Sequence, residues 1–235
     1  FSYLLVGKRI TGLGRRGKYL LFHLADGYDL VAHLRMTGRL TLAAGADPLL
    51  PHTHVIIHLD SGPCLRWTDT RRFGRLYLGQ ADRVLAAAGV QELGPEPLDP
   101  AFDVAALAAI CAGRRRPLKQ VLLDQHLLAG IGNIYADETL FLAGLHPLRP
   151  AASLSGEEVA RLHQSMRVVL EQGIANYGTS IRDYVDSSGR RGRNQDCLQV
   201  YGRVGQPCGR CGRTLERLKI GGRTTVFCPA CQPLE

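Results

Sequence analysis

The sequence lacks the features that would place the chain in a membrane or export it. No apolar run approaches the roughly 18 residues that a membrane-spanning helix needs. The first residues show no signal-peptide pattern, and neither internal repeats nor low-complexity segments occur. We therefore expect neither a membrane span nor secretion, and we take a monomer as the default.

Acidic residues are too few to balance the basic ones. The chain has 29 Lys and Arg against 21 Asp and Glu, a net charge of +8 and a pI near 9.3. Such a surplus favours a polyanionic partner, although a merely soluble basic protein is the alternative. Three of the cysteines show no ligand spacing, and we expect them to be buried thiols in a reducing compartment. They are Cys64, Cys111 and Cys197.

The other four cysteines form two Cys-x-x-Cys pairs near the C-terminus, with sixteen residues between the pairs. This spacing predicts one structural Zn²⁺ with four thiolate ligands, at a β-hairpin. A redox dithiol or a disulfide pair is the less favoured alternative. The ligands would be Cys208, Cys211, Cys228 and Cys231. Between the pairs, Gly221 and Gly222 can turn the hairpin and hold Arg223 at its tip, where it could reach an anion.

The first eighty residues predict strands, and the pattern then changes. Short β-branched or aromatic segments separated by Gly, Asp and Pro indicate an antiparallel sandwich or barrel. They are residues 18–24, 29–36, 53–59, 65–69 and 75–78. Residues 93–100 then contain three prolines, a density that allows neither a helix nor a central strand, and we place a domain boundary there.

Beyond that boundary the period is helical. We expect helices over 101–112, 117–125 and 133–142, and a capping box of Ser155 and Glu158 opening a longer helix. That helix should bury one stripe, formed by Val159, Leu162, Met166, Val169 and Leu170. Residues 177–194 are polar and contain glycine, which suggests a mobile loop. The predicted domains are therefore 1–94, 95–195 and 196–235.

Asn133 follows Gly130-Ile131-Gly132 at the expected start of a helix. Unpaired N–H groups and the positive end of the helix dipole favour a phosphate there, and glycines allow close approach of a backbone. A plain N-cap is the alternative for an isolated Asn.

Four motifs together resemble one known family. They are the stretch 123–138, Leu93–Leu98, Thr68–Arg75, and Val200–Arg203 leading into the zinc hairpin. In this order and over essentially the whole chain, the sequence resembles the formamidopyrimidine-DNA glycosylase and endonuclease VIII family, with the oxidised-purine branch closer. The resemblance implies an α+β multidomain fold: an N-terminally truncated antiparallel β-sandwich, a helix-two-turn-helix domain and a C-terminal zinc-finger hairpin.

The resemblance also implies base-excision repair. Such enzymes bend duplex DNA, flip out a damaged base, cut its glycosidic bond and nick the strand by β- and δ-elimination through a Schiff base. Met36 and Phe73 match the wedge residues, and Arg71 matches the residue that faces the orphaned base. A flexible apolar side chain and a flat ring suit intercalation. Taken singly, Met36 and Phe73 would more often be core residues.

Other basic residues match further positions of the family. Lys18 matches a lysine that assists strand cleavage, and Arg223 matches the hairpin arginine that holds the phosphate beside the lesion and helps the δ-elimination. Three more match DNA-contacting positions: His52, Arg115 and Lys119. For the run 114–116, a solvated charged face is an equal alternative. Residues 177–194 correspond to a loop that closes over the everted base.

The sequence departs from the family at three places. The family's amino-terminal proline nucleophile and adjoining glutamate are missing, since the chain begins Phe1-Ser2-Tyr3. We therefore expect the chain as given to lack glycosylase and lyase activity. Three explanations are open: the segment is lost from the record or the gene model, it was removed on purpose, or it is naturally absent from a relative that binds damaged DNA without cutting it. Arg35 replaces a Gly before Met36, and Thr70 replaces a Pro before Arg71.

Three functions remain open at this point. The first is a DNA glycosylase and AP lyase acting on 8-oxoguanine and formamidopyrimidines in duplex DNA, with oxidised bases or abasic sites as its targets. The second is a non-catalytic damaged-DNA-binding protein of the same fold. The third is a zinc-ribbon transcription or RNA-binding factor, which would have no need of the glycine-flanked Asn133 or of the Arg71-Arg72-Phe73 motif.

Overall fold

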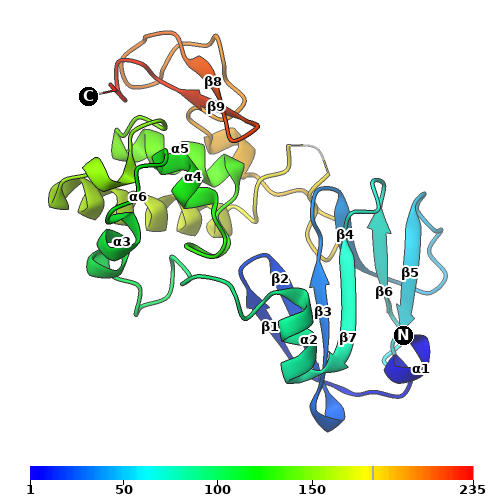
Figure 1. The fold of residues 1–235 in the computed structure, drawn as a ribbon. Coiled ribbons are helices and arrows are strands. Elements are labelled where there is room, and N and C mark those ends of the chain that lie inside the picture. The colour runs from blue at the N-terminus through cyan, green and yellow to red at the C-terminus, as the bar shows by residue number, and fades with distance from the viewer. Residues whose placement is uncertain (182, 235) are drawn as a thin grey trace. The chain divides into compact units, whose positions relative to one another are not determined.

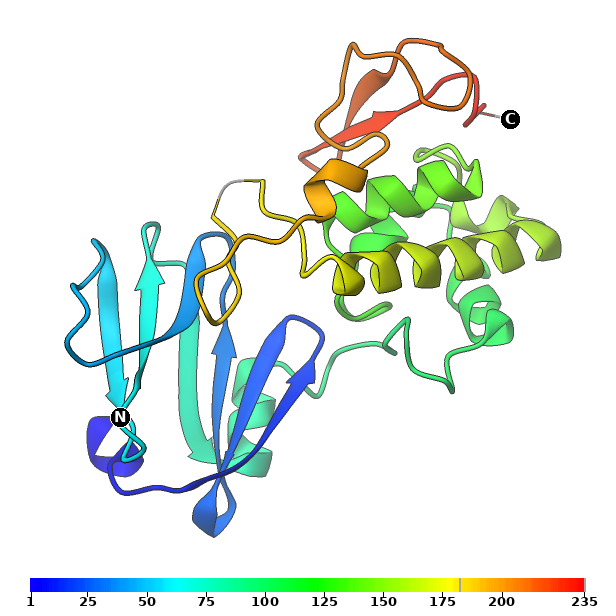
Figure 2. The same ribbon diagram turned by 180° about the vertical axis from the view of Figure 1, so that it is seen from behind.

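The computed structural model describes residues 1–181 and 183–234, which form two compact units (Figures 1 and 2). The first unit comprises Phe1–Glu92 and Ala175–Gln195, and the second comprises Leu93–Ile174 and Asp196–Glu235. Each unit has its own hydrophobic core, and each is described by itself.

The first unit is an antiparallel β-sandwich. One sheet has the order β1-β2-β3-β7, formed by Ile10–Arg16, Tyr19–Leu24, Tyr28–His33 and Arg75–Gln80. The other has the order β4-β6-β5, formed by Gly38–Ala43, Cys64–Asp69 and Thr53–His58. Apolar side chains from both sheets form the core, including Phe22, Leu30, Leu65 and Trp67. Helix α1 (Ser2–Leu5), the 3-10 turn η1 (Ala25–Gly27) and helix α2 (Ala81–Ala88) complete the sheet region.

The sandwich and the five predicted strands are confirmed, with boundaries that differ by up to three residues. Strands β1 and β4 and helix α2 were not predicted. Strand β1 is an edge strand that contains two glycines, so it carries little β-pattern. Its glycines make room for a side chain of β2, because a Cβ on Gly14 would lie 3.2 Å from Nε2 of His23.

Four connections gather at one end of the sandwich, which is the upper end of the strands in Figure 1. The strand register fixes this placement, since Tyr19 pairs with His33 and His33 with Arg75. In the other sheet, Asp69 pairs with Gly38. The connections are residues 17–18, 34–37, 51–52 and 70–74. All of the predicted DNA-contacting residues of this unit lie on them.

The second unit consists of helices and a hairpin. Its helices are α3 (Val104–Cys111), α4 (Leu118–Leu123), α5 (Asn133–Ala143) and α6 (Gly156–Ala175), with the 3-10 turn η2 (Ala151–Ser153). The 3-10 turn η3 (Asn194–Cys197) spans the point in the chain at which the first unit ends and the second resumes. The hairpin strands are β8 (Glu216–Ile220) and β9 (Arg223–Phe227). The predicted capping box is present, since the Ser155 N–H donates to Glu158 and the Glu158 N–H donates to Ser155 Oγ.

The long helix buries the expected stripe: Val159, Leu162, Met166 and Val169 are buried, and Leu170 packs beside them. A buried carboxylate fixes the chain that leads to the hairpin. Glu138 on α5 accepts hydrogen bonds from the backbone N–H groups of Gln199, Val200 and Tyr201 at 2.8 to 2.9 Å. The predicted α+β architecture is thus confirmed for the helical and hairpin parts as well.

Residues 177–193 contain no helix or strand among those described. This segment packs on the sandwich, because the Leu42 N–H donates to the Ser187 carbonyl and Arg39 pairs with Asp183 at 3.1 Å. The predicted mobility of this loop, and the predicted division at 94 and 195, stay predictions. In the described part of the chain, no helix combines the length and the apolar character needed to cross a bilayer.

The cysteines outside the predicted zinc site differ in exposure. Cys64 and Cys111 are buried as expected, but Cys197, in the 3-10 turn η3, is only partly buried.

A glycine at position 74 is predicted to contribute to the stability of the sandwich. A Cβ at this position would lie 2.3 Å from Cζ2 of Trp67, so Gly74→Ala should destabilise the first unit by about 1–3 kcal/mol through overpacking. Urea unfolding followed by the fluorescence of the only tryptophan measures this effect. Gly45→Ala is the matched control, because its added Cβ meets no atom within 4 Å. Equal stability of the two variants would contradict the prediction.

Candidate nucleic-acid interface

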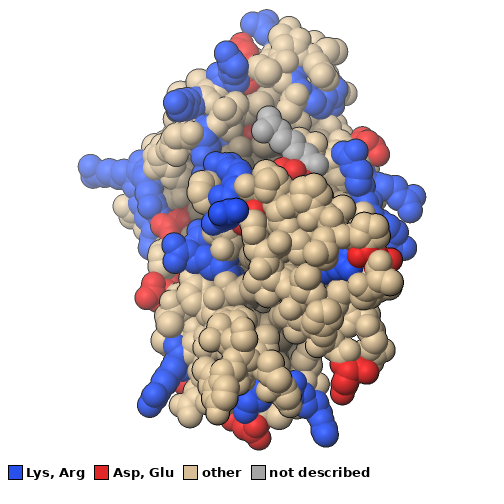
Figure 3. Space-filling view, turned by 90° about the vertical axis from the view of Figure 1, so that its right-hand side faces the viewer, with Lys and Arg blue, Asp and Glu red and all other residues tan. Residues whose placement is uncertain are grey.

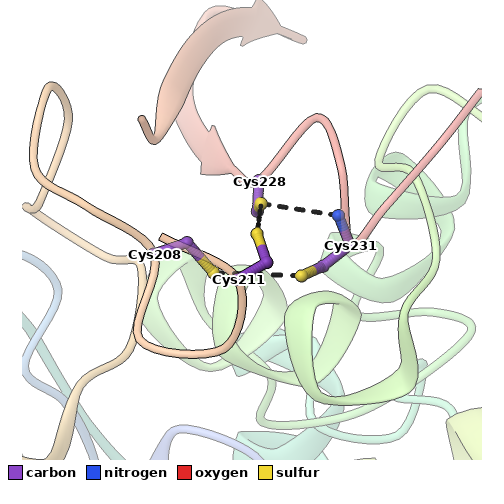
Figure 4. A group of neighbouring side chains, drawn as sticks. All are labelled: Cys208, Cys211, Cys228 and Cys231. Carbon is purple, nitrogen blue, oxygen red and sulfur yellow. Dashed lines mark hydrogen bonds between the residues drawn. The ribbon is translucent and has the colours of Figure 1, made fainter. Parts of the chain in front are cut away.

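The four predicted cysteine ligands converge at the base of the hairpin (Figure 4). Cys208 and Cys211 precede β8, and Cys228 and Cys231 follow β9. Their sulfur atoms all lie within 4.8 Å of one another, with separations of 3.9 Å between Cys208 and Cys231 and 3.5 Å between Cys211 and Cys228.

These separations fit a zinc ion. Four sulfurs at about 2.3 Å from a tetrahedral Zn²⁺ lie about 3.8 Å from one another. Without a cation, burial and then the neighbouring cysteines raise the pKa of Cys231 to about 12, which disfavours its thiolate form. A divalent cation stabilises the thiolate form of all four cysteines by binding them. The protein therefore carries one structural zinc with four cysteine ligands.

The hairpin presents Arg223 at its tip, as predicted. Ile220 pairs with Arg223, and the two residues between them, Gly221 and Gly222, have φ of 55° and 76°. Positive φ at both central positions defines the type I′ turn, whose twist matches that of the flanking strands. Arg223 is exposed beside this turn.

A buried ion pair holds the hairpin against the helices. Nζ of Lys119 on α4 lies 2.6 Å from Oδ1 of Asp137 on α5, and neither side chain is exposed. Lys119 also donates to Oγ1 of Thr225 at 2.6 Å and to the Thr224 carbonyl at 3.2 Å. Asp137 accepts from the Val226 N–H at 3.2 Å. Strand β9 is therefore bonded to both helices immediately behind Arg223.

This pair sits in an environment that opposes charge. Burial raises the pKa of Asp137 to about 6, against the opposing effect of Lys119. Burial likewise lowers the pKa of Lys119, against the opposing effect of Asp137. The side chain of Lys119 is fully buried, where it bonds Asp137 and Thr225. Its contact with DNA stays a prediction. Neither Asp137 nor Thr225 was singled out from the sequence.

Asn133 lies next to the hairpin tip. It is the first residue of α5, whose N-cap is Gly132, so the N-cap interpretation of Asn133 is wrong. Its Nδ2 donates to the Thr224 carbonyl at 3.0 Å instead. The structure thus brings together the start of α5, Asn133 and the residue after Arg223. Arg115 is exposed on the connection between α3 and α4.

In the first unit, the candidate residues are exposed at the end of the sandwich. Met36 and Phe73 are 64% and 51% exposed, which rules out a core role for either apolar side chain. The guanidinium of Arg71 lies over the Phe73 ring, 4.6 Å from its centroid. His52 and Lys18 are also exposed, Lys18 in the turn between β1 and β2.

The backbone at this end is strained at three non-glycine residues. Arg35, His52 and Arg72 have φ of 55°, 65° and 56°, in the left-handed region that favours glycine. At position 35, glycine would adopt this conformation without that cost, and the structure does not explain why arginine stands there. The structure offers no explanation for Thr70 in place of proline.

His33, the last residue of β3, lies at the same end of the sandwich and was not singled out from the sequence. Burial, followed by the charges of Arg35 and Lys18, lowers the pKa of His33 to about 4. The ring is therefore neutral at pH 7; its Nδ1 accepts from the Arg35 N–H at 3.0 Å, and it meets the Tyr19 ring edge to face at 4.5 Å. Its position two residues before Arg35 was the only available signal.

The surface charge agrees with an anionic partner. On the face drawn in Figure 3, Lys and Arg side chains are more extensive than Asp and Glu side chains. A net charge of +8 produces a field that attracts polyanions.

Three segments of the chain match known family models. Residues 1–76 match the N-terminal domain of formamidopyrimidine-DNA glycosylase, and residues 93–185 match its H2TH domain. Residues 205–234 match a zinc finger found in FPG and IleRS.

Whole-chain relatives agree with these matches. A formamidopyrimidine-DNA glycosylase of Moorella thermoacetica is 69% identical over 93% of this chain and 80% of its own length. The solved MutM (Fpg) protein of Thermus thermophilus superposes with a TM-score of 0.91 at 44% identity, covering 99% of this chain and 86% of the other. Lactococcus lactis Fpg, solved in complex with DNA containing an abasic site, gives a TM-score of 0.90 at 40% identity, with 97% and 84% covered.

A β-sandwich, a helix-two-turn-helix region and a four-cysteine finger together define a zinc-finger DNA glycosylase of base-excision repair. The chain belongs to the formamidopyrimidine-DNA glycosylase family.

Removal of one partner of the buried pair should destabilise the second unit strongly. Lys119→Met leaves Asp137 buried without a counter-ion, which costs about 3–5 kcal/mol. The double variant Lys119→Met/Asp137→Leu should recover part of this loss, because no unpaired charge remains. Thermal unfolding followed by circular dichroism measures both. Lys219→Met, the same change at an exposed lysine of the hairpin, should have little effect; an equal loss there would refute the prediction.

Arg35→Gly separates charge from backbone strain. The measured quantity is the slope of the logarithm of the duplex-binding constant against the logarithm of the salt concentration (the salt slope). If Arg35 reaches a DNA phosphate, the variant should lower the magnitude of this slope by about one unit. Its stability should change by less than about 1 kcal/mol, since relief of strain is offset by greater freedom of the unfolded chain. Arg35→Ala should show the same slope and a stability close to that of the parent protein, because alanine keeps the strained φ that arginine already has. A salt slope equal to that of the parent protein would exclude the phosphate contact.

Proposed function

We propose that this protein removes oxidised purines, such as 8-oxoguanine and formamidopyrimidines, from duplex DNA and then nicks the strand by β- and δ-elimination. The observation that carries the proposal is the junction at which Asn133, at the start of α5, bonds the hairpin backbone beside Arg223. The complex of the Lactococcus lactis relative with abasic-site-containing DNA supports damaged DNA as the substrate class.

The junction suits one phosphate of the bent strand. The N–H groups in the first turn of α5 and the positive end of its dipole attract an anion, and Arg223 adds a fixed charge next to them. The zinc ion takes no part in the chemistry; when bound, it fixes the two cysteine turns that frame the hairpin. In this proposal Arg223 holds the phosphate beside the lesion and assists the second elimination step.

The loops of the sandwich suit the gap that an everted base leaves. Met36 and Phe73 are apolar yet exposed, as wedges between base steps must be. Arg71 stacks on Phe73 and can direct its guanidinium donors to the orphaned base. Lys18 is proposed to contact the sugar and phosphate of the lesion, and His52 and Arg115 to contact further phosphates. Residues 177–194 would cover the everted base.

We further propose that the protein acts as a monomer in the bacterial cytoplasm, in association with the nucleoid where its substrate lies. Size-exclusion chromatography with light scattering, with and without DNA, tests the monomer.

The phosphate junction is tested by binding to a duplex that contains a tetrahydrofuran abasic site. Asn133→Ala and Arg223→Ala should each weaken binding about ten-fold, as the loss of a charged or charge-assisted hydrogen bond does. Removal of zinc by a chelator should weaken binding further, because Arg223 loses its support. Arg217→Ala, at an exposed arginine of the same hairpin, is the control. Unchanged affinity after all three changes would sink the proposal.

The chemistry is tested by borohydride trapping on an abasic-site duplex with the protein expressed from its own gene. A covalent protein–DNA adduct supports the lyase activity, because borohydride traps the Schiff base through which the elimination proceeds. Tight abasic-site binding without an adduct would show a damage-binding protein instead, and a preference for single-stranded RNA would contradict both.

A further inference from the structure

Asp69, the last residue of β6, connects the two loops that carry the proposed wedge residues. Asp69 is buried, with only 1% of its surface exposed. Oδ1 accepts from Oγ1 of Thr37 at 2.5 Å and from the Arg71 N–H at 3.2 Å, and Oδ2 accepts from the Gly74 N–H at 2.7 Å. Thr37 follows Met36, and Arg71 and Gly74 flank Phe73. One carboxylate therefore bonds both loops.

A second link closes the arrangement. The Arg71 N–H also donates to Oγ1 of Thr37 at 3.2 Å, so the loops are joined directly as well as through Asp69. The backbone of Asp69 takes part too: its carbonyl accepts from the Arg72 N–H at 3.3 Å and bonds Nε2 of His54 at 2.9 Å. The position of one loop is thus not independent of the other.

The two loops are built alike. In each, a non-glycine residue with positive φ immediately precedes the exposed apolar residue: Arg35 before Met36 and Arg72 before Phe73. In each, a tightly packed glycine follows, since a Cβ on Gly38 would meet the Leu34 carbonyl oxygen at 2.4 Å and one on Gly74 would meet Trp67 at 2.3 Å. Strained residues persist only where surrounding bonds fix them, and the bonds here converge on Asp69.

The chemistry of the acceptor matters. Three donors, one hydroxyl and two N–H groups, point at the two carboxylate oxygens, and a carboxylate is the only small side chain that accepts at both. Burial raises the pKa of Asp69, but the bonds from Thr37, Gly74 and Arg71 outweigh it, and the net pKa is lowered. An asparagine would turn an N–H group toward at least one of these donors.

We infer that Asp69 is a positioning residue that locks the two loops into one preformed wedge, so that Met36, Arg71 and Phe73 enter the base stack together. This inference rests on the proposed role of these three residues in filling the gap. Asp69 itself touches no DNA. It acts by removing the cost of ordering two loops when the duplex is bent.

The test uses a duplex with a tetrahydrofuran abasic site and 2-aminopurine as the base opposite it, whose fluorescence reports on stacking. Asp69→Asn and Thr37→Val should each weaken binding about ten-fold and reduce the fluorescence change on binding, as the loss of a charge-assisted hydrogen bond does. Thr37→Ser keeps the hydroxyl and should restore both. Asp69→Asn that binds and stacks like the parent protein would overturn the inference.

Controls separate positioning from loss of fold. Asp29→Asn removes another buried carboxylate of the sandwich, one that bonds His23 at 2.9 Å and lies at the β2–β3 pairing away from the loops. It should leave the 2-aminopurine signal unchanged. If Asp69→Asn does not fold, which tryptophan fluorescence reveals, Thr37→Val decides, because it removes the hydroxyl alone. Equal loss of signal for Asp29→Asn and Thr37→Val would also contradict the inference.

The same assay distinguishes this inference from the proposed function. Met36→Ala and Phe73→Ala should abolish most of the fluorescence change if these residues are the wedge. If they have no effect, the wedge assignment fails. If they act and the Asp69 and Thr37 variants do not, the wedge stands and only the positioning role of Asp69 fails.

Discussion

The buried ion pair between Lys119 and Asp137 is the constraint on which the second unit depends. Desolvation of two charges is expensive, and the pair is tolerated because each member has further partners on strand β9. An apolar pair could fill the same volume, but it could not bond Thr225 and the Val226 N–H. The pair therefore fixes where the strand lies along the helices, which apolar packing alone would leave less well defined.

Patterns with a local cause were readable from the sequence. Ligand spacing predicted the zinc site, the paired glycines predicted the turn before Arg223, and Ser155 with Glu158 predicted the start of α6. In each case the residues that determine the structure are close in the chain, and one physical requirement selects them. Strand β1 was missed because its glycines are set by the neighbouring strand β2. They leave room for the side chain of His23, and no local sequence rule connects His23 to them.

Properties that depend on distant residues were not readable. Lys119 follows a run of arginines and looks like a surface cation, and only Asp137 and Thr225, eighteen and more than a hundred positions away, draw it inside. In the sequence Arg35 looks like an added charge, whereas its φ of 55° shows that the main constraint at this position is a left-handed backbone conformation. Exposure likewise separated Met36 and Phe73 from core residues, a distinction that residue type cannot make.

Strand β9 shows how a structural metal can influence a distant arginine. Its last residue, Phe227, adjoins the zinc ligand Cys228, and its first residue is Arg223. Between these ends, consecutive residues of the strand are bonded to α4 and α5 by Lys119, Asp137 and Asn133. A strand anchored at one end by four thiolates and along its length by three side chains has little freedom left at the other end. Arg223 thus gains a fixed position, which its proposed role in the electrostatic stabilisation of a phosphate requires.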